Sequence, residues 1–320
     1  MEKIAYEVGA LMYSPALNDK VVEMIVNKKY NFKYSLALCL EDSICDDMVS
    51  IAQKQVIKTL SKIANLKKLK GISLPKIFIR VREAKQILEI FESLREGTES
   101  LTGFLIPKYS LENCDQYNEI ISLINKKSNK KIYIMPILES SDIINLDTRI
   151  KYLKELKNKI DSIKEYILNI RVGGNDFCKE FRVRRNYKQT IYEITPVRNI
   201  LSDILTVFSR EYVVSGPVWE YFASENDEWK RGLEKEIELD KLNGFIGKTV
   251  IHPKQIEVVN EGLKVSKEDY EDAKEIIKWE NPELAVGKSH NGQRMNEVKV
   301  HFKWAEKIVT LADIYGVKGE

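Results

Sequence analysis

The sequence has little of several features that mark specialised classes of protein. Its 320 residues include four cysteines (Cys39, Cys45, Cys114 and Cys178), and none forms the Cys-x-x-Cys pair typical of zinc sites. There are only three histidines, and we propose no metal site built from them. No apolar stretch is long enough to cross a membrane, and the mixed N-terminus has no signal-peptide core. We therefore expect a reducing, cytoplasmic setting and no membrane partner.

Charge of either sign is not in excess. Lys and Arg number 51 and Asp and Glu 48, which gives a net charge of +3, so the chain as a whole gives no case for nucleic acid as a partner. The lysine runs Lys67–Lys70 and Lys126–Lys131 are most simply read as solvated helix ends and loops. Hydrophobic residues make up 43% of the chain, enough for a full core.

About eight short apolar runs are present, separated by amphipathic Lys/Glu-rich segments of helical period. This alternation predicts a parallel sheet covered on both faces, and eight units in one chain predict a closed (β/α)8 barrel, a TIM barrel. We expect the barrel over residues 1–260 and a C-terminal helical extension over residues 261–320. The expected strands are Ile4–Ser14, Ser35–Asp42, Lys76–Arg82, Gly103–Lys108, Lys131–Ser140, Tyr166–Asp176, Glu211–Trp219 and Gly247–Pro253.

Most of these runs end in a charged or polar side chain. In a barrel the carboxyl ends of the strands share one rim, where catalytic groups usually lie. The side chains expected to converge there are Glu41, Asp42, Arg80, Arg82, Lys108, Glu139, Asp176 and His252.

Glu139 and Asp176 follow neighbouring predicted strands, the second through a Gly-Gly pair that allows a sharp turn. Two carboxylates with water in the other positions suit Mg²⁺, which can polarise a carbonyl or bind an enolate. Taken alone, the pair could equally be salt-bridged acids.

Arg80 and Arg82 are two apart in one predicted strand, so we expect both to point to the same side and one of them to hold a substrate carboxylate. Either could instead pair with Glu41 or Asp42. His252 ends the last predicted strand, where an acid/base or substrate role and a structural role are equally open.

Two segments lie outside the regular rhythm. Phe177–Arg210 is long enough to be a substrate wall or only a surface excursion. After Ser266, which opens a helix with Asp269 in a capping box, the stretch Asn281–Arg294 has no strand pattern and a last helix is expected at Val298–Tyr315. We expect this extension to dock over the rim, with surface packing as the alternative.

Several short motifs together resemble the citrate-lyase beta-subunit-like family of the aldolase/citrate lyase superfamily. The resemblance runs from about Ser14 to the last helix, and also points to a divergent branch of C–C bond lyases associated with tellurium-resistance gene clusters. The motifs are L-E-D-S-I (Leu40–Ile44), I-R-V-R (Ile79–Arg82), I-P-K (Ile106–Lys108), I-L-E-S (Ile137–Ser140), G-G-N-D (Gly173–Asp176), G-F-I-G-K-T-V-I-H-P-K-Q-I (Gly244–Ile256), M-N-E (Met295–Glu297) and W-A (Trp304–Ala305).

The resemblance implies a Mg²⁺-dependent lyase that cleaves or forms a carbon–carbon bond next to a carboxylate or thioester. It implies Glu139 and Asp176 as metal ligands, Arg80 on the substrate, and Glu41 and Asp42 orienting Arg80 and metal-bound water. Family members often use coenzyme A or carrier thioesters and form trimers, which implies a homo-oligomer here.

The chain departs from the family at two places. Arg82 stands where an asparagine is usual, which favours a more anionic substrate. The acid near the C-terminus, often shared between subunits, is carried over to Glu297. The leading hypothesis is therefore a Mg²⁺-dependent lyase or aldolase acting through an enolate. A thioester hydrolase using the same site and a barrel that binds an anionic metabolite without turnover are the alternatives.

Overall fold

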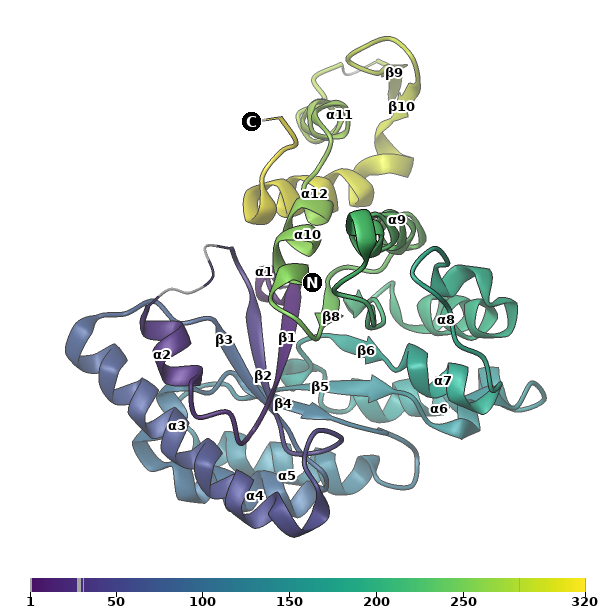
Figure 1. Cartoon of the computed structure of the whole chain (residues 1–320). Coiled ribbons are helices and arrows are strands. Elements are labelled where there is room, and N and C mark those ends of the chain that lie inside the picture. Colours follow the sequence, from purple (N-terminus) through teal and green to yellow (C-terminus); the bar gives the residue numbers. More distant parts are fainter. Residues whose placement is uncertain (1, 28–29, 31, 282, 320) are drawn as a thin grey trace.

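The computed structural model describes residues 2–27, 30, 32–281 and 283–319. Eight strands form one sheet in the order β7-β6-β5-β4-β3-β2-β1-β8, and every neighbouring pair is parallel. A parallel bridge between Gly216 and Lys248 links β7 to β8, so the sheet closes on itself. The helices surround it (Figure 1). The predicted TIM barrel is confirmed.

The bounds of the elements follow. The strands are β1 (Ala10–Pro15), β2 (Ser35–Cys39), β3 (Lys76–Arg80), β4 (Gly103–Ile106), β5 (Tyr133–Leu138), β6 (Ile170–Val172), β7 (Val214–Ser215), β8 (Lys248–Val250), β9 (Val286–Lys288) and β10 (Met295–Glu297). The helices are α1 (Lys3–Tyr6), α2 (Val21–Val26), α3 (Val49–Lys70), α4 (Ala84–Leu94), α5 (Cys114–Lys127), α6 (Arg149–Asp161), α7 (Gly174–Glu180), α8 (Thr195–Phe208), α9 (Glu228–Asn243), α10 (Lys254–Leu263), α11 (Lys267–Ile277) and α12 (Val298–Tyr315).

The helices pack against the sheet through apolar residues that lie on one face of each helix. In α3 the buried positions include Ala52, Val56, Leu60 and Ile63, which repeat every three to four residues and so lie on one face. Its exposed face carries lysines, and the helix ends at Gly71 in the left-handed conformation. No described helix is long and apolar enough to cross a membrane.

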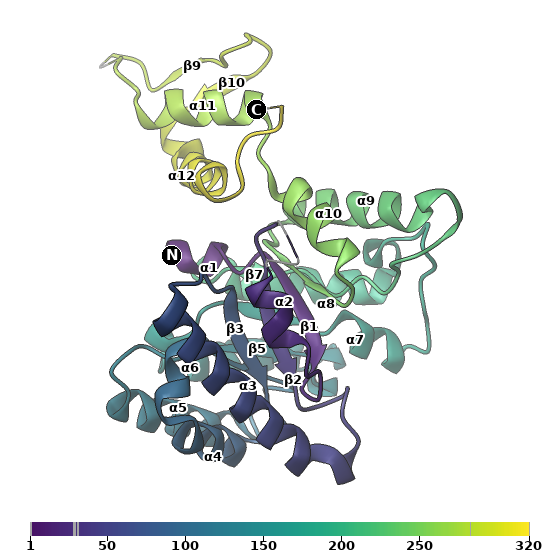
Figure 2. The same ribbon diagram turned by 60° about the vertical axis from the view of Figure 1, so that its left-hand side comes forward.

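The C-terminal extension, α11 to α12, lies at the amino-terminal end of the barrel. The Tyr315 hydroxyl donates to the carbonyl of Tyr6, and Lys33, just before β2, donates to the carbonyl of Ile314. Ile308 and Leu311 of α12 share one buried apolar cluster with residues of α1 and the strands. Figures 1 and 2 show the extension beyond the end at which the chain starts.

The carboxyl ends of the strands lie at the other end of the barrel, so the extension does not cover the rim of its own chain; docking over the rim of a neighbouring subunit stays a prediction. The predicted division after residue 260 falls inside α10, and the extension as a packed unit begins with α11. The Ser266 side chain accepts from the Asp269 N–H, as the capping pattern predicts.

Three sequence predictions of local structure need correction. The predicted first strand begins only at Ala10, because residues 3–6 form α1 and Gly9 turns the chain at φ +53°. Part of Asn281–Arg294 is strand, since β9 pairs with β10 in a hairpin. The sequence also predicts a helix over Asp19–Lys29, but α2 covers only Val21–Val26, and Lys28 and Lys29 lie outside the described residues.

The segment Phe177–Arg210 is anchored rather than loosely attached. Arg185 is buried, donates to the carbonyl of Val218 and lies 3.4 Å from Glu236 of α9. Its guanidinium also stacks on the Trp219 ring at 5.0 Å. These contacts fix the chain between α7 and α8 against the barrel wall.

Candidate active site

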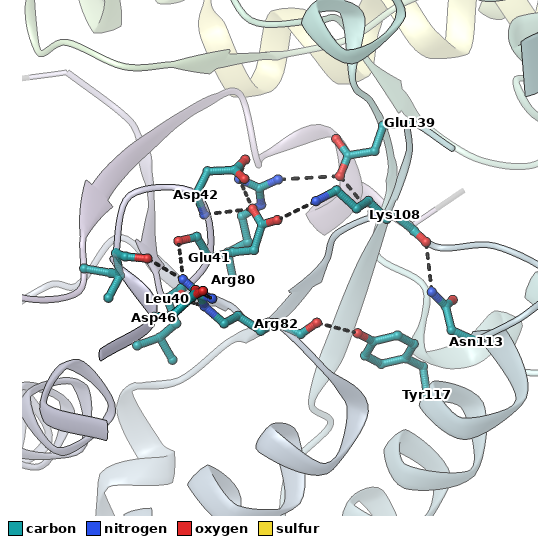
Figure 3. A network of polar contacts seen from close by, with 11 residues as sticks. Leu40, Glu41, Asp42, Asp46, Arg80, Arg82, Lys108, Asn113, Tyr117 and Glu139 are labelled. Carbon is teal, nitrogen blue, oxygen red and sulfur yellow. Dashed lines mark hydrogen bonds and ion pairs between the residues drawn. The ribbon is translucent and has the colours of Figure 1, made fainter. Parts of the chain in front are cut away.

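Arg80, the last residue of β3, joins three carboxylates (Figure 3). Its Nη1 lies 2.9 Å from Glu41 Oε2 and 2.8 Å from Asp42 Oδ2, and its Nη2 lies 3.5 Å from Glu139 Oε1. Glu41 and Asp42 come directly after β2, which pairs with β3, so neighbouring strand ends supply the whole group. The predicted convergence of these four side chains is therefore present in the structure.

Glu139 follows β5 and is 7% exposed. Its Oε1 accepts from the backbone N–H of Lys108 at 2.9 Å as well as facing Arg80. Lys108 adopts a left-handed conformation at φ +49°, uncommon for a residue with a side chain. Its ammonium extends to Glu41 Oε1 at 3.0 Å, so Lys108 contacts both acids.

The second oxygen of Glu139 faces Asp176, which lies in the first turn of α7. A Cβ added to Gly173 would lie 2.5 Å from Glu139 Oε2 and 2.8 Å from Asp176 Oδ2. The glycine therefore leaves open the space between the two carboxylates. We name Glu139, Gly173 and Asp176 the carboxylate cradle.

The electrostatics of the cradle favour a cation. Burial raises the pKa of Glu139 to about 8; Arg80 opposes this shift, whereas the charge of Asp176 adds to it. Two neighbouring carboxylates repel each other when both are ionised, and a bound divalent cation stabilises that doubly ionised form. Within the described residues no three His, Cys, Asp or Glu side chains gather to hold a metal. The residues fit Mg²⁺, which binds through one or two carboxylates and keeps several waters.

The cradle opens on a cavity of about 190 Å³. Its wall includes three side chains that the sequence patterns did not single out, namely Tyr13, Arg171 and Thr249. Tyr13, from β1, lies under the Arg80 guanidinium at 5.7 Å, and burial raises its pKa to about 12. Arg171, from β6, donates to the Thr249 hydroxyl at 2.7 Å. The remaining lining residues are Asp42, Arg80, Ile137, Glu139, Val172, Gly173, Gly174, Asn175, Asp176, Val218 and Ile251.

Asp42 stays ionised beside this cavity. Burial alone would raise its pKa, but the hydrogen bond with Glu41 and the charge of Arg80 together lower it. Its side chain remains 66% exposed, so Asp42 is the solvent-facing member of the group, whereas Glu41 is buried.

Arg82 does not point the same way as Arg80, so the prediction from alternation is wrong. The strand ends at Arg80, and alternation does not continue past it. The Arg82 guanidinium donates to the carbonyls of Leu40, Glu41 and Ile44 and lies 2.5 Å from Asp46. It thereby holds the loop that carries Glu41 and Asp42, and it does not line the cavity.

His252 lies outside the cavity lining, next to Ile251, which belongs to it. Its ring stacks on Phe222 at 4.6 Å, and its Nδ1 accepts from the Lys254 N–H at the start of α10. Burial, with a smaller effect of Lys254, lowers its pKa. These contacts hold the His252 side chain against neighbouring residues at the rim.

Glu297 ends β10 and immediately precedes α12, in the extension at the amino-terminal end of the barrel. Its backbone N–H donates to His301 Nδ1 at 3.0 Å. The structure therefore separates Glu297 from the cavity of its own chain.

Residues 2–317 match the family described as C–C bond lyase of the TIM-barrel fold. The chain belongs to this family. Among solved structures it is similar to CitE of Mycobacterium tuberculosis, in complex with magnesium, acetoacetate and coenzyme A. That likeness has a TM-score of 0.63 at 17% identity, over 97% of this chain and 99% of CitE.

Two further solved structures show the same fold. A citrate lyase of Burkholderia xenovorans LB400 has a TM-score of 0.71 at 11% identity, over 97% of this chain and 93% of that one. A Haloferax volcanii malate synthase with magnesium and glyoxylate has a TM-score of 0.60 at 13% identity, over 78% and 74%. No curated protein matches the chain. Such identities establish a shared fold and leave activity to the site.

Proposed function

We propose that this C–C bond lyase is Mg²⁺-dependent and cleaves or forms a carbon–carbon bond of a small carboxylate substrate, or its thioester, through an enolate. The observation that carries the proposal is the carboxylate cradle, with Glu139 Oε2 and Asp176 Oδ2 facing one open space beside Arg80. Structural neighbours described with magnesium and acetoacetate, pyruvate or glyoxylate support the same chemistry.

Glu139 and Asp176 would hold the metal, which when bound supplies positive charge to polarise a substrate carbonyl. The chain's own contribution is Arg80. Its side chain lines the cavity, where the guanidinium can face an anionic oxygen of the substrate. Glu41 and Asp42 fix the plane of the guanidinium before substrate arrives, which is the pre-organisation that stabilises developing charge.

The other predicted residues divide into two groups. Lys108 positions Glu139 through its backbone and offers an ammonium beside Glu41. We propose that Arg82 and His252 support the rim and do not bind substrate. A coenzyme A or carrier group is too large for a cavity of about 190 Å³ and would lie outside it. We also propose a homo-oligomer, a trimer, and a cytoplasmic location, with which the four free cysteines are consistent.

Calorimetric titration with Mg²⁺ tests the metal assignment. Glu139→Gln and Asp176→Asn should each weaken binding by at least about tenfold, because each removes an anionic ligand. Glu180→Gln is the matched control, since Glu180 is exposed on the same helix as Asp176. Equal affinity in all four proteins would show that the cradle is not the metal site.

Proton exchange tests the enolate without knowledge of the natural substrate. The wild type with Mg²⁺ should exchange the methyl protons of pyruvate or acetoacetate with deuterated water, measured by NMR. Exchange that stops on metal removal supports the lyase. Binding of both acids without exchange would favour a binding protein. Thioester hydrolysis without exchange would favour the hydrolase.

A further inference from the structure

Tyr13, on β1, has a hydroxyl proton that no described residue is seen to accept. Its side chain is partly exposed and lines the cavity that contains the cradle. Arg171 hydrogen-bonds to the hydroxyl. Because a guanidinium has donors and no acceptor, the phenol oxygen must be the acceptor of that bond. The O–H group therefore remains free to donate to a molecule in the cavity.

Tyrosines packed elsewhere around the barrel donate their protons to the protein. The hydroxyl of Tyr109 donates to Asn118 Oδ1 at 2.8 Å, and that of Tyr192 donates to Asp240 Oδ1 at 2.6 Å. Such bonds are the usual arrangement for a tyrosine hydroxyl away from bulk water. Tyr13 differs because its oxygen is already held by a cation while its proton has no partner in the described chain.

A reaction through an enolate needs a proton for the enolate carbon, and the cavity wall limits which group can supply it. The titratable side chains among the described lining residues are Tyr13, Asp42, Arg80, Glu139, Arg171 and Asp176. The two cradle acids are ionised when they hold the metal, and Asp42 stays ionised beside Arg80. Arg80 is paired with three carboxylates, and Arg171 is only 1% exposed. Tyr13 is the described lining group left with a proton to give.

The surroundings of Tyr13 suit a proton that is released only to a strong base. Burial raises the pKa of Tyr13 to about 12, against the charges of Arg80 and Arg171. The phenol therefore keeps its proton at neutral pH until a strongly basic atom, such as an enolate carbon, forms beside it. The same two cations would stabilise the phenolate that remains, since one donates to its oxygen and the other lies 5.7 Å from the ring centroid.

We propose that Tyr13 is the acid that protonates the enolate carbon and, in the reverse direction, the base that removes that proton. The inference rests on the proposed function, because it takes the enolate as formed at the cradle. The O–H bond of Tyr13 breaks as a C–H bond forms, and the carbonyl is restored. The negative charge passes from the enolate to the phenolate oxygen, and water returns the proton. Arg171 acts as a positioning residue, and the step needs no second copy, unlike the role carried over to Glu297.

Exchange of the methyl protons of pyruvate in deuterated water, with Mg²⁺ at pH 7, tests this role by NMR. The proteins compared are the wild type, Tyr13→Phe and the control Tyr152→Phe. Tyr152 is also partly exposed, and its hydroxyl bonds to Asp142 outside the cavity. Tyr13→Phe should slow exchange by at least about 100-fold, the usual size of an acid–base contribution. Its Mg²⁺ affinity and pyruvate affinity should match the wild type, and the control should exchange at the wild-type rate.

Replacement of Tyr13 by 3-fluorotyrosine gives a second readout that a structural role would not change. Fluorine lowers the pKa of the phenol and hardly alters its shape, so more phenolate is present to remove a methyl proton. Exchange at pH 7 should rise by roughly three- to fivefold, as expected for a base whose ionised fraction grows faster than its basicity falls.

Three results would overturn the assignment. They are wild-type exchange in Tyr13→Phe, an unchanged rate with 3-fluorotyrosine, and loss of Mg²⁺ binding together with exchange in Tyr13→Phe, which would indicate a structural role. If Tyr13→Phe does not fold, the 3-fluorotyrosine protein decides. As long as the wild type exchanges, these failures leave the proposed function intact. A wild type that binds Mg²⁺ and pyruvate but does not exchange would refute both.

Discussion

Gly173→Ala places a methyl group inside the carboxylate cradle. The new Cβ would lie 2.3 Å from Glu139 Cβ, 2.5 Å from Glu139 Oε2 and 2.8 Å from Asp176 Oδ2. Carbon atoms in contact are normally separated by about 3.5–4 Å, so at least one of the two acids must move. The backbone at Gly173, φ −93° and ψ 74°, does not itself demand glycine. The effect therefore comes from space, not from backbone conformation.

Two consequences of different size are expected. Overpacking of a buried site should lower the free energy of unfolding by about 1–3 kcal/mol, partly offset by about 0.4–1 kcal/mol because alanine restricts the unfolded chain. Mg²⁺ requires both oxygens at about 2.0–2.1 Å in near-ideal geometry. Displacement of either acid should weaken Mg²⁺ binding by at least about 100-fold, more than the loss of a group that only supports a ligand.

Calorimetric titration and thermal denaturation measure both effects. Gly71→Ala is the control, because Gly71 at the end of α3 has φ +61° and no atom within 4 Å of an added Cβ. It should cost about 1–2 kcal/mol through backbone strain and leave Mg²⁺ affinity unchanged. Wild-type Mg²⁺ affinity in a folded Gly173→Ala protein would refute the cradle.

Three further predictions concern the acids and bases of the site. Arg80→Lys should slow pyruvate proton exchange by at least about 100-fold while weakening Mg²⁺ binding far less, and an unchanged exchange rate would contradict the role of Arg80. Because the folded pKa of Glu139 is raised from 4.5 to about 8, its contribution to metal-free stability is full below pH 4.5 and is lost as pH rises to about 8. The increase in the free energy of unfolding that Mg²⁺ produces should grow over the same pH range. An increase that does not change with pH would refute this. So would a metal-free Glu139→Gln protein whose stability depends on pH in the same way as that of the wild type. If copies share Glu297, mixed oligomers of Glu297→Gln and Glu139→Gln should regain activity that neither has alone, and no recovery despite demonstrated subunit exchange would refute sharing.

The barrel and its rim acids could be predicted because each depends on local sequence. A fully buried parallel strand is a short apolar run, and the residue after it lies on a shared rim whatever the distance in sequence. Glu139 directly follows β5, and Arg80 ends β3, as expected. The exact strand ends were less predictable, since β6 and β7 are only three and two residues long inside longer apolar runs.

Arg82 and Arg171 show where the sequence misleads. Arg82 is two residues after Arg80, but strand geometry ends between them, so spacing alone could not assign its direction. Arg171 sits within the apolar run Tyr166–Val172, where an arginine is unexpected for a buried strand. That mismatch was the available signal. The burial of Arg171, and the lack of hydrogen-bond partners for its Nε and Nη1 among the described residues, become visible only in the three-dimensional arrangement.

The position of the C-terminal extension is the part of the fold that the sequence predicts least well. The sequence predicts the helix α12 correctly. It does not predict which end of the barrel α12 covers, because an amphipathic stripe shows that a helix packs on something but not on what. Since α12 packs at the amino-terminal end, a catalytic role for Glu297, which stays a prediction, would require the cavity of another copy. The extension also contains the exposed apolar side chains Leu284, Val286, Met295, Val300 and Phe302. Exposed apolar side chains that form a contiguous patch are typical of a surface covered in an assembly. The predicted sharing of Glu297 and these exposed apolar side chains would both be explained by a neighbouring chain.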